Sequence, residues 1–372
     1  MYRVSTLVLA ISPLLFAQTA SSATLLNKAW EFGVGDRPYI TTGDSNRSIT
    51  FNPTTNNLLI VGGSGAAPTV NIVNAVTGAD VGSLNMTGIT GGARLLSQIS
   101  VAEDGAIYGT NLTTTTNAPL TIYKWADESA APVVVYNDSS SRLFGTNGST
   151  GAREGDTLDV RGSGASTQLT VGSSGGLGAS FVNNRVAILT PTDSTATAFT
   201  AQAFELGTAS LSADYRHSIA FGAGNTIYSK EAGGDTTVRV TTFDLGVPSA
   251  STSNLTNGTY ITSRTASLGV DLVNNLIAFV QIPAAPGVHE LRLFEFPDSG
   301  TELVYLESAV FPEDTGIANN GYLGDVQFAQ IGGATYLYAV SANNGLIAFV
   351  LPEPASLAFL GLGSMMLVLR RR

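Results

Sequence analysis

The chain of 372 residues contains no cysteine and only two histidines, His217 and His289. Without cysteine there can be no disulfide scaffold, no thiol nucleophile and no thiolate metal site. Two histidines cannot build a histidine-rich metal site, and they leave a Ser-His-Asp triad only two candidate bases. The composition therefore excludes several classes of enzyme and metalloprotein before any motif is considered.

Charged residues are also scarce, at 12% of the chain, which is about half the usual 25%. Only three of them are lysines, whereas glycine, serine, threonine and asparagine are abundant. A shortage of strong helix formers favours strands and turns. The length suits either two average domains or one large all-β domain.

The first 23 residues have the three parts of a secretory signal peptide. Arg3 provides the positive charge, residues 4–16 form an apolar core, and Ser21-Ser22-Ala23 is a small-residue cleavage site. We therefore expect export through the Sec machinery, with cleavage after Ala23.

The C-terminus has an equally distinct organisation. A Pro-Glu-Pro triplet is followed by an apolar run over residues 355–369 and by three consecutive arginines: Pro352, Glu353, Pro354, Arg370, Arg371 and Arg372. This arrangement resembles the sorting tail of the PEP-CTERM family of exported bacterial proteins. The resemblance implies cleavage near the triplet by an exosortase-type membrane protease, after a transient stay in the membrane. The apolar run of about 15 residues is shorter than the roughly 20 of a typical membrane helix, but flanking arginines can hold such a segment.

The expected mature domain spans residues 24–351, between the signal peptide (1–23) and the sorting tail (352–372). Without the two ends, 14 basic and 27 acidic residues remain, and the net charge becomes about −13. Such an acidic surface repels phosphate groups, so nucleic acid is not an expected partner. We expect the mature protein at the cell surface or in the extracellular matrix.

A repeated pattern runs through the mature domain. A polar residue, an aliphatic anchor, any residue and an apolar residue are followed by an Asn, Gly or Asp turn and a second alternating strand. The anchors are Ile49, Ile99, Leu158, Ile219, Leu268 and Val326. They lie 49 to 61 residues apart, a third strand follows in each unit, and a fourth follows in several.

Four short antiparallel strands per unit of about 55 residues predict an all-β fold, a six-bladed β-propeller. Seven blades are the alternative, because residues 179–181 and 186–189 could form an additional hairpin. Tandem β-sandwiches would instead repeat at about 100 residues. The sixth unit has only three strands, and we expect residues 25–32, which include Trp30, to supply its outer strand and close the ring.

The candidate binding residues are acids that precede the anchors. Asp44, Asp156, Asp214 and Asp325 are expected at one mouth of the central channel, together with His217. Such carboxylates could hold Ca²⁺ or act as general acid and base on a sugar. They could equally be residues that begin turns, and the chain has no D-x-D-x-D-G calcium loop. No other cofactor is implied.

These sequence features predict an exported module that binds a protein or a polysaccharide without catalysis. The alternative is a carbohydrate-active hydrolase or lyase that uses the carboxylates at the mouth. A structural surface-layer protein is a third reading. Fold alone does not decide among them, because propellers carry many functions.

Overall fold

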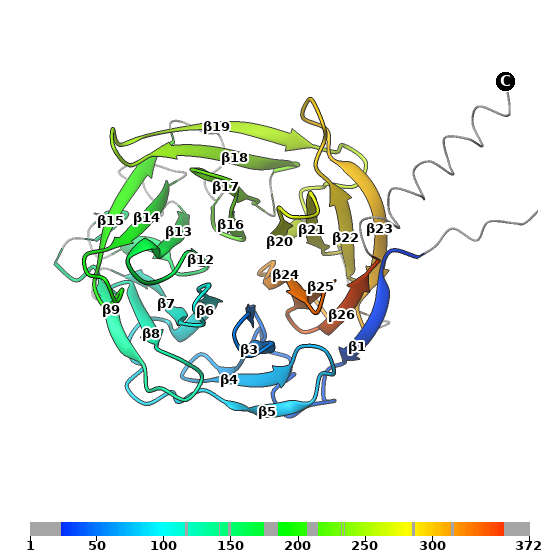
Figure 1. Ribbon diagram of the computed structural model, residues 1–372, viewed down its shortest axis with the longest axis horizontal. Helices are drawn as coiled ribbons and strands as arrows, with labels where there is room; N and C mark the ends of the chain where they lie inside the picture. The colour runs from blue at the N-terminus through cyan, green and yellow to red at the C-terminus, as the bar shows by residue number, and fades with distance from the viewer. Residues whose placement is uncertain are drawn as a thin grey trace, which may run out of the picture. The chain divides into compact units, whose positions relative to one another are not determined.

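The computed structural model describes residues 24–352 except 116–117, 141, 148–149, 175–184, 207–214, 232, 234, 285–286 and 314–315. The described residues form 26 β-strands and one short 3-10 helix, Gly164–Ser166. The protein is therefore all-β, as the composition predicted. The sheets surround a common central axis (Figure 1).

Four of the sheets have four antiparallel strands each. The first contains β2 (Ile49–Asn52), β3 (Asn57–Ser64), β4 (Ala67–Asn74) and β5 (Asp80–Ser83). Another contains β16 (Ile219–Phe221), β17 (Thr226–Ser229), β18 (Thr237–Asp244) and β19 (Ser249–Thr256). It is followed by β20 (Thr265–Asp271), β21 (Leu276–Gln281), β22 (Glu290–Glu295) and β23 (Val304–Val310). The last contains β24 (Gly324–Ile331), β25 (Ala334–Ser341), β26 (Gly345–Leu351) and, from the other end of the chain, β1 (Asn27–Phe32).

The remaining ten strands form one continuous sheet. One part consists of β6 (Arg94–Val101), β7 (Ile107–Thr115), β8 (Thr121–Trp125) and β9 (Val133–Asn137). Another consists of β12 (Asp159–Arg161), β13 (Gln168–Ser174), β14 (Arg185–Pro191) and β15 (Phe199–Glu205). The hairpin of β10 (Thr146–Asn147) and β11 (Thr150–Glu154) joins the two parts, because β11 pairs with both β7 and β13. This hairpin was not predicted from the sequence.

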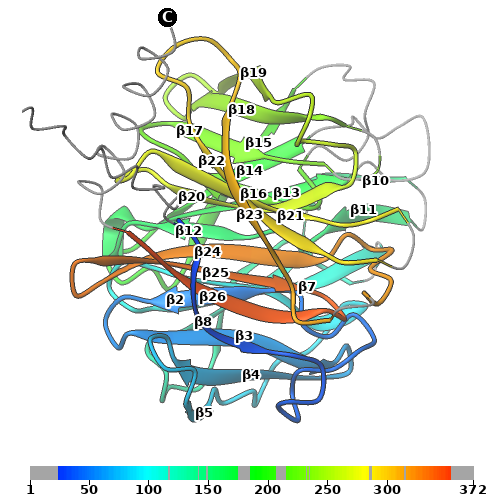
Figure 2. The same cartoon turned by 90° about the vertical axis from the view of Figure 1, so that its right-hand side faces the viewer.

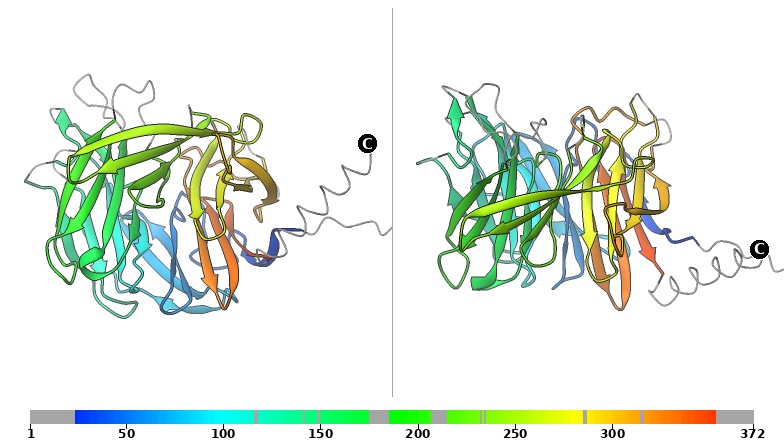
Figure 3. Two further views of the ribbon diagram at one scale, coloured as in Figure 1. Left: turned by 45° about the horizontal axis from the view of Figure 1, so that its top comes forward. Right: turned by 90° about the horizontal axis from the view of Figure 1, so that it is seen from above.

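The innermost strands contact one another in a closed cycle: β2, β6, β12, β16, β20, β24 and again β2. Hydrophobic clusters of buried side chains lie between neighbouring sheets all the way around, including one between the last sheet and the first that contains Ile60 and Tyr338. The turned views show the sheets packed face to face around the axis (Figures 2 and 3). The arrangement is propeller-like, and its core is distributed among the contacts between sheets.

The repeated pattern of the sequence has a direct structural counterpart. All six aliphatic anchors are buried, with exposed fractions of 7% or less. The turns between the first two strands of a unit use residues that tolerate positive φ, such as Asn56 at 54° and Asn275 at 59°. The predicted anchors and hairpin turns are thus confirmed.

The ring is closed by the strand that the sequence analysis selected. β1 pairs antiparallel with β26, with Lys28 opposite Phe349 and Phe32 opposite Leu346. Figure 1 shows β1 at the outer edge of this sheet. Immediately before β1, Glu307 of β23 accepts hydrogen bonds from the backbone N–H groups of Leu25 and Leu26, at 2.6 and 3.0 Å. The beginning of the described chain is therefore tied to two neighbouring sheets.

Several sequence predictions concern residues outside the described part of the chain. They include the signal peptide with Ala23, the apolar run, and Glu353, Pro354, Arg370, Arg371 and Arg372; Pro352 directly follows β26. Residues 179–181 of the seven-blade alternative also lie outside, whereas 186–189 belong to β14, the third strand of its unit. No helix among the residues described here combines the length and the apolar character needed to cross a bilayer.

Candidate functional site

Polar side chains beside several anchors link one inner strand to the next. Ser48 Oγ accepts a hydrogen bond of 3.2 Å from the backbone N–H of Ile99, and Ser218 Oγ accepts one of 2.6 Å from Leu268. In both cases the polar residue directly precedes one anchor and binds the backbone of the following anchor. The polar position of the repeated pattern therefore has a structural role in these units.

Asp325 occupies the same position in the last unit. Its Oδ2 atom accepts hydrogen bonds from Ser48 Oγ at 2.9 Å and from the backbone N–H of Ile49 at 3.1 Å. Its Oδ1 atom accepts one from the N–H of Val326 at 2.8 Å. Burial raises the pKa of this carboxyl group to about 7, against the opposing effect of the hydrogen bonds. Asp325 thus joins the last inner strand to the first.

Asp159 makes an equivalent link farther along the ring. Its Oδ2 atom accepts a hydrogen bond of 2.7 Å from the N–H of Phe221, and its Oδ1 atom accepts one of 3.2 Å from Ser100 Oγ. Burial raises the pKa of Asp159 to about 6. Two of the carboxylates near the axis are therefore engaged by backbone amides and serine hydroxyls of adjacent strands.

Asp156 has a different environment, formed by three arginines. Its carboxylate is paired with Arg153, with Arg47 Nη2 at 3.5 Å and with Arg216 Nε at 3.4 Å. These residues come from β11, from the segment before β2 and from the segment before β16, so the cluster spans three units of the ring. Burial alone would raise the pKa of Asp156, but the charges and hydrogen bonds of Arg153, with Arg47 and Arg216, hold it below its usual value. We refer to Arg47, Arg153 and Arg216 as the arginine cluster.

Arg47 is the most enclosed member of the arginine cluster. Its side chain is 2% exposed, whereas those of Arg153 and Arg216 are each 29% exposed. Within the described part of the chain, no group accepts a hydrogen bond from Arg47 Nε or Nη1. Burial, reinforced by nearby Arg94 and Arg153, lowers the pKa of Arg47 to about 10, so it remains charged at neutral pH. A buried guanidinium with unused donors is costly unless another acceptor is supplied.

A cavity at the axis includes Asp156 and Asp325 but none of the three arginines. It is lined by residues that precede or begin the inner strands: Gln98, Asp156, Thr157, Leu158, His217, Ser218, Ile219, Gly324 and Asp325. The structure thus brings together three of the predicted site residues, Asp156, His217 and Asp325. A second cavity, lined by β12, β16, β20 and β24, also includes Asp159 and Asp325.

The other predicted residues are placed differently. Asp44 lies in a turn with φ of 59° and forms reciprocal hydrogen bonds with Asn343, whose side chain accepts from the Asp44 N–H and donates to its carboxylate, both at 2.9 Å. It is not among the residues that line the two cavities. Asp214 lies outside the described residues.

The two histidines have separate surroundings. His217 packs edge-on against Tyr322, with ring centroids 5.6 Å apart, and burial followed by the charge of Arg216 lowers its pKa to about 3. His289 Nδ1 lies 2.8 Å from Ser341 Oγ, and burial lowers its pKa to about 4. Both imidazoles are therefore neutral at physiological pH.

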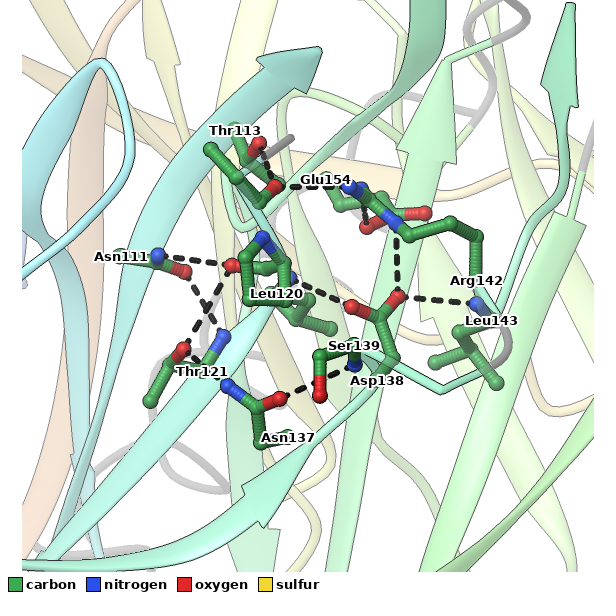
Figure 4. Close-up of polar contacts among 12 residues, drawn as sticks. Asn111, Thr113, Leu120, Thr121, Asn137, Asp138, Ser139, Arg142, Leu143 and Glu154 are labelled. Atoms are coloured by element: carbon green, nitrogen blue, oxygen red, sulfur yellow. Dashed lines mark hydrogen bonds and ion pairs between the residues drawn. The ribbon is translucent and has the colours of Figure 1, made fainter. Parts of the chain in front are cut away.

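A second buried charge cluster fixes the inserted hairpin (Figure 4). Arg142 Nε lies 3.1 Å from Asp138 Oδ2, and Arg142 Nη2 lies 2.5 Å from Glu154 Oε2. Arg142 Nη1 also donates to the carbonyl oxygen of Ala118 at 2.7 Å. Burial, followed by the charge of Asp138, raises the pKa of Glu154 to about 8. This cluster ties β11 to the loops that flank β8 and β9.

The carboxylates do not gather into a metal site in the described residues. Among them, no three His, Asp or Glu side chains are arranged so that they could hold a metal ion together. Asp156, which lines the first cavity, is instead surrounded by the donors of the arginine cluster, although none of the three arginines lines that cavity. Arginine is suited to bind carboxylate, sulfate or phosphate groups through paired N–H donors.

The sequence pattern indicated the acids but not the arginines. A signal for them was present, since each cluster arginine lies within three residues of a selected aspartate: Arg47 after Asp44, Arg153 before Asp156, and Arg216 after Asp214. In a chain with few charges, such pairs of opposite charge before three of the six inner strands could have predicted an ion-paired cluster.

The fold and the site define an all-β, propeller-like protein with a polar cavity at its axis and an arginine cluster around Asp156. No protein-family model matches the chain, and no curated protein matches it. Solved structures do match. A DUF4623 family protein from Bacteroides eggerthii aligns with a TM-score of 0.58 and 14% identity over 89% of this chain and 77% of that one. A luciferin-regenerating enzyme aligns with a TM-score of 0.53 and 14% identity over 87% and 96% of the two chains. At this identity the likeness concerns the fold alone.

Proposed function

We propose that the protein is an exported, non-catalytic module that binds polysaccharide outside the cell, built on a six-bladed propeller. The observation that carries the non-catalytic assignment is the engagement of the candidate carboxylates. Asp156 is paired with three arginines, and Asp325 is bound by two backbone amides and a serine hydroxyl. A general acid and base need carboxylates that can exchange protons with a substrate.

The blade number is part of this proposal. Six inner strands follow one another around the axis, and the ten-stranded sheet contains two four-stranded parts that the β10–β11 hairpin bridges. Counting these parts separately gives six blades, with β1 completing the last. The closed ring leaves a polar entrance at the axis, which is where propellers offer a site for a ligand.

Export and sorting rest on the two ends of the sequence. We propose that the Sec machinery and an exosortase-type protease remove residues 1–23 and the tail that begins near Pro352. Intact-mass measurement of the protein from cells and from medium tests this step. A mature species that retains either end at the cell surface or in the medium would contradict it.

A saccharide-panel experiment tests the binding function. We expect the purified protein to retain one or more polysaccharides without releasing shortened products. Product release that is lost in both Asp156→Asn and Asp325→Asn would instead support a hydrolase or lyase. Absence of any retention would support a structural surface protein.

A further inference from the structure

The arginine cluster carries more positive charge than the described residues around it neutralise. Three guanidinium groups share the single carboxylate of Asp156, which leaves an excess of two charges in the cluster. Among the described residues, the charges that act on Arg47 and Arg216 from outside the cluster are one cation, Arg94, and two anions, Asp44 and Glu231. They reduce the excess to one positive charge and do not remove it.

The hydrogen-bonding capacity shows the same imbalance. Each guanidinium has five N–H donors, whereas one carboxylate offers about four acceptor positions. Arg47 makes this plain, because its Nε and Nη1 atoms have no acceptor in the described residues although the side chain is 2% exposed. Among the residues that the structure describes, this enclosed guanidinium thus lacks a full set of acceptors.

We infer that the arginine cluster is a binding site for a carboxylate or sulfate group of an acidic polysaccharide. This inference rests on the proposed function, because it names the class of polymer that the entrance would take. Arg153 and Arg216 are partly exposed and would contact the anion first, while Arg47, which is 2% exposed, would add charge from a buried position. Asp156 keeps the three side chains in place through charge-assisted hydrogen bonds.

The acidity of the whole protein makes this site easy to test. The net charge of −10 disfavours non-specific association with a polyanion, so binding of one requires a local site that overcomes the general repulsion. Neutral sugars lack the charge that the arginine cluster recognises. We therefore expect the protein to bind acidic polymers in preference to neutral ones, although the protein itself is acidic.

The experiment compares three polymers by titration calorimetry: polygalacturonate, dextran sulfate and unmodified dextran. We expect one or both acidic polymers to bind and dextran not to bind at the same concentration. The polymer that binds identifies the source of the anion as carboxylate or sulfate. Arg216→Gln and Arg153→Gln, which each leave two arginines on Asp156, should weaken binding by about tenfold or more, as expected for the loss of a charged hydrogen bond.

Arg37→Gln is the matched control, because Arg37 pairs with Asp80 outside the cluster. It should change affinity less than about twofold. Equal binding by the wild type, Arg216→Gln and Arg153→Gln would overturn the inference while leaving polysaccharide binding intact. Selective binding of a neutral polymer would do the same.

A second measurement tests anion binding at the arginine cluster independently of polysaccharide binding. Sodium sulfate, compared with sodium chloride at equal ionic strength, should raise the melting temperature of the wild type more than that of Arg216→Gln. A sulfate effect without polymer binding would support the anion site and contradict the polysaccharide function. Failure of both measurements would overturn the inference.

Discussion

The indole Nε1 of Trp30 donates a hydrogen bond of 2.9 Å to the carbonyl oxygen of Ala75. Trp30 belongs to the closing strand β1, whereas Ala75 directly follows β4 of the first sheet. The same carbonyl oxygen accepts a hydrogen bond of 3.0 Å from Tyr338 Oη in the last sheet. One backbone acceptor therefore joins the first and last sheets of the propeller-like ring. The aromatic ring centroids of Trp30 and Tyr338 lie 5.9 Å apart.

Replacement of Trp30 tests this closure. Trp30→Ala removes the hydrogen bond and the aromatic contacts, and we expect it to lower the free energy of unfolding by about 3 kcal/mol. Trp30→Phe keeps an aromatic ring and should cost only about 1 kcal/mol, the value of a single hydrogen bond. Lys28→Ala, at an exposed position of the same strand, serves as the control. Thermal denaturation that fails to separate Trp30→Ala from Lys28→Ala would contradict the closing role.

A charge placed at an anchor should prevent folding of the ring. Ile219 is 7% exposed in the cluster between β14 and β16, so Ile219→Asp buries a carboxylate without a partner. We expect a loss of at least about 3 kcal/mol and no soluble secreted protein. Val273→Asp is the matched control, because Val273 is 80% exposed. The yield of secreted protein measures the effect, and a normal yield for Ile219→Asp would refute the buried position.

The links between inner strands can be tested at Asp325. Asp325→Ala leaves the N–H of Ile49 without its side-chain acceptor, and we expect a loss of about 1–3 kcal/mol at pH 7. Asp325→Ser should recover part of this loss, since Ser48 and Ser218 make the corresponding link in other units. Denaturant titration measures the series, with the exposed Asp298→Ala as the control. If Asp325→Ala and Asp298→Ala were equally stable, the carboxylate of Asp325 would not be a structural link.

The sequence predicted the repeating part of the fold because that part depends on local rules. Alternating apolar residues, turn residues such as Asn56 and a spacing near 55 residues are all local signals. The closing strand was also predictable, because the last unit lacked an outer strand and residues 25–32 had no other partner. The β10–β11 hairpin was missed, since its pairing with two neighbouring strands depends on contacts across units.

The candidate site was less predictable for the same reason. Asp156, His217 and Asp325 were expected near one another, and they do line one cavity. Their chemical state, however, depends on partners far apart in the sequence, such as Arg47 for Asp156 and Ile49 for Asp325. A pattern of acids shows where carboxylates will lie, but not whether a neighbouring strand already engages them.

The pH dependence of stability should reveal the raised pKa of Glu154. Its pKa is raised from 4.5 to about 8, so the folded protein binds a proton there that the unfolded chain has released at neutral pH. The contribution of this group to stability is complete below pH 4.5 and is lost as the pH rises towards 8. One pKa unit corresponds to about 1.4 kcal/mol, so the loss amounts to a few kcal/mol.

Glu154→Gln should remove this part of the pH dependence, because glutamine keeps an oxygen for Arg142 and does not titrate. His217 and His289 have lowered pKa values and give the opposite slope below about pH 6.5, in the variant as in the wild type. The difference between wild type and variant therefore isolates Glu154. Urea denaturation at intervals from pH 5 to pH 9 measures it, with Glu290→Gln, a partly exposed partner of Arg292, as the control. A difference that stays constant with pH would show that Glu154 is already ionised in the folded protein. An equal change for Glu290→Gln would show that the pH dependence is not specific to Glu154.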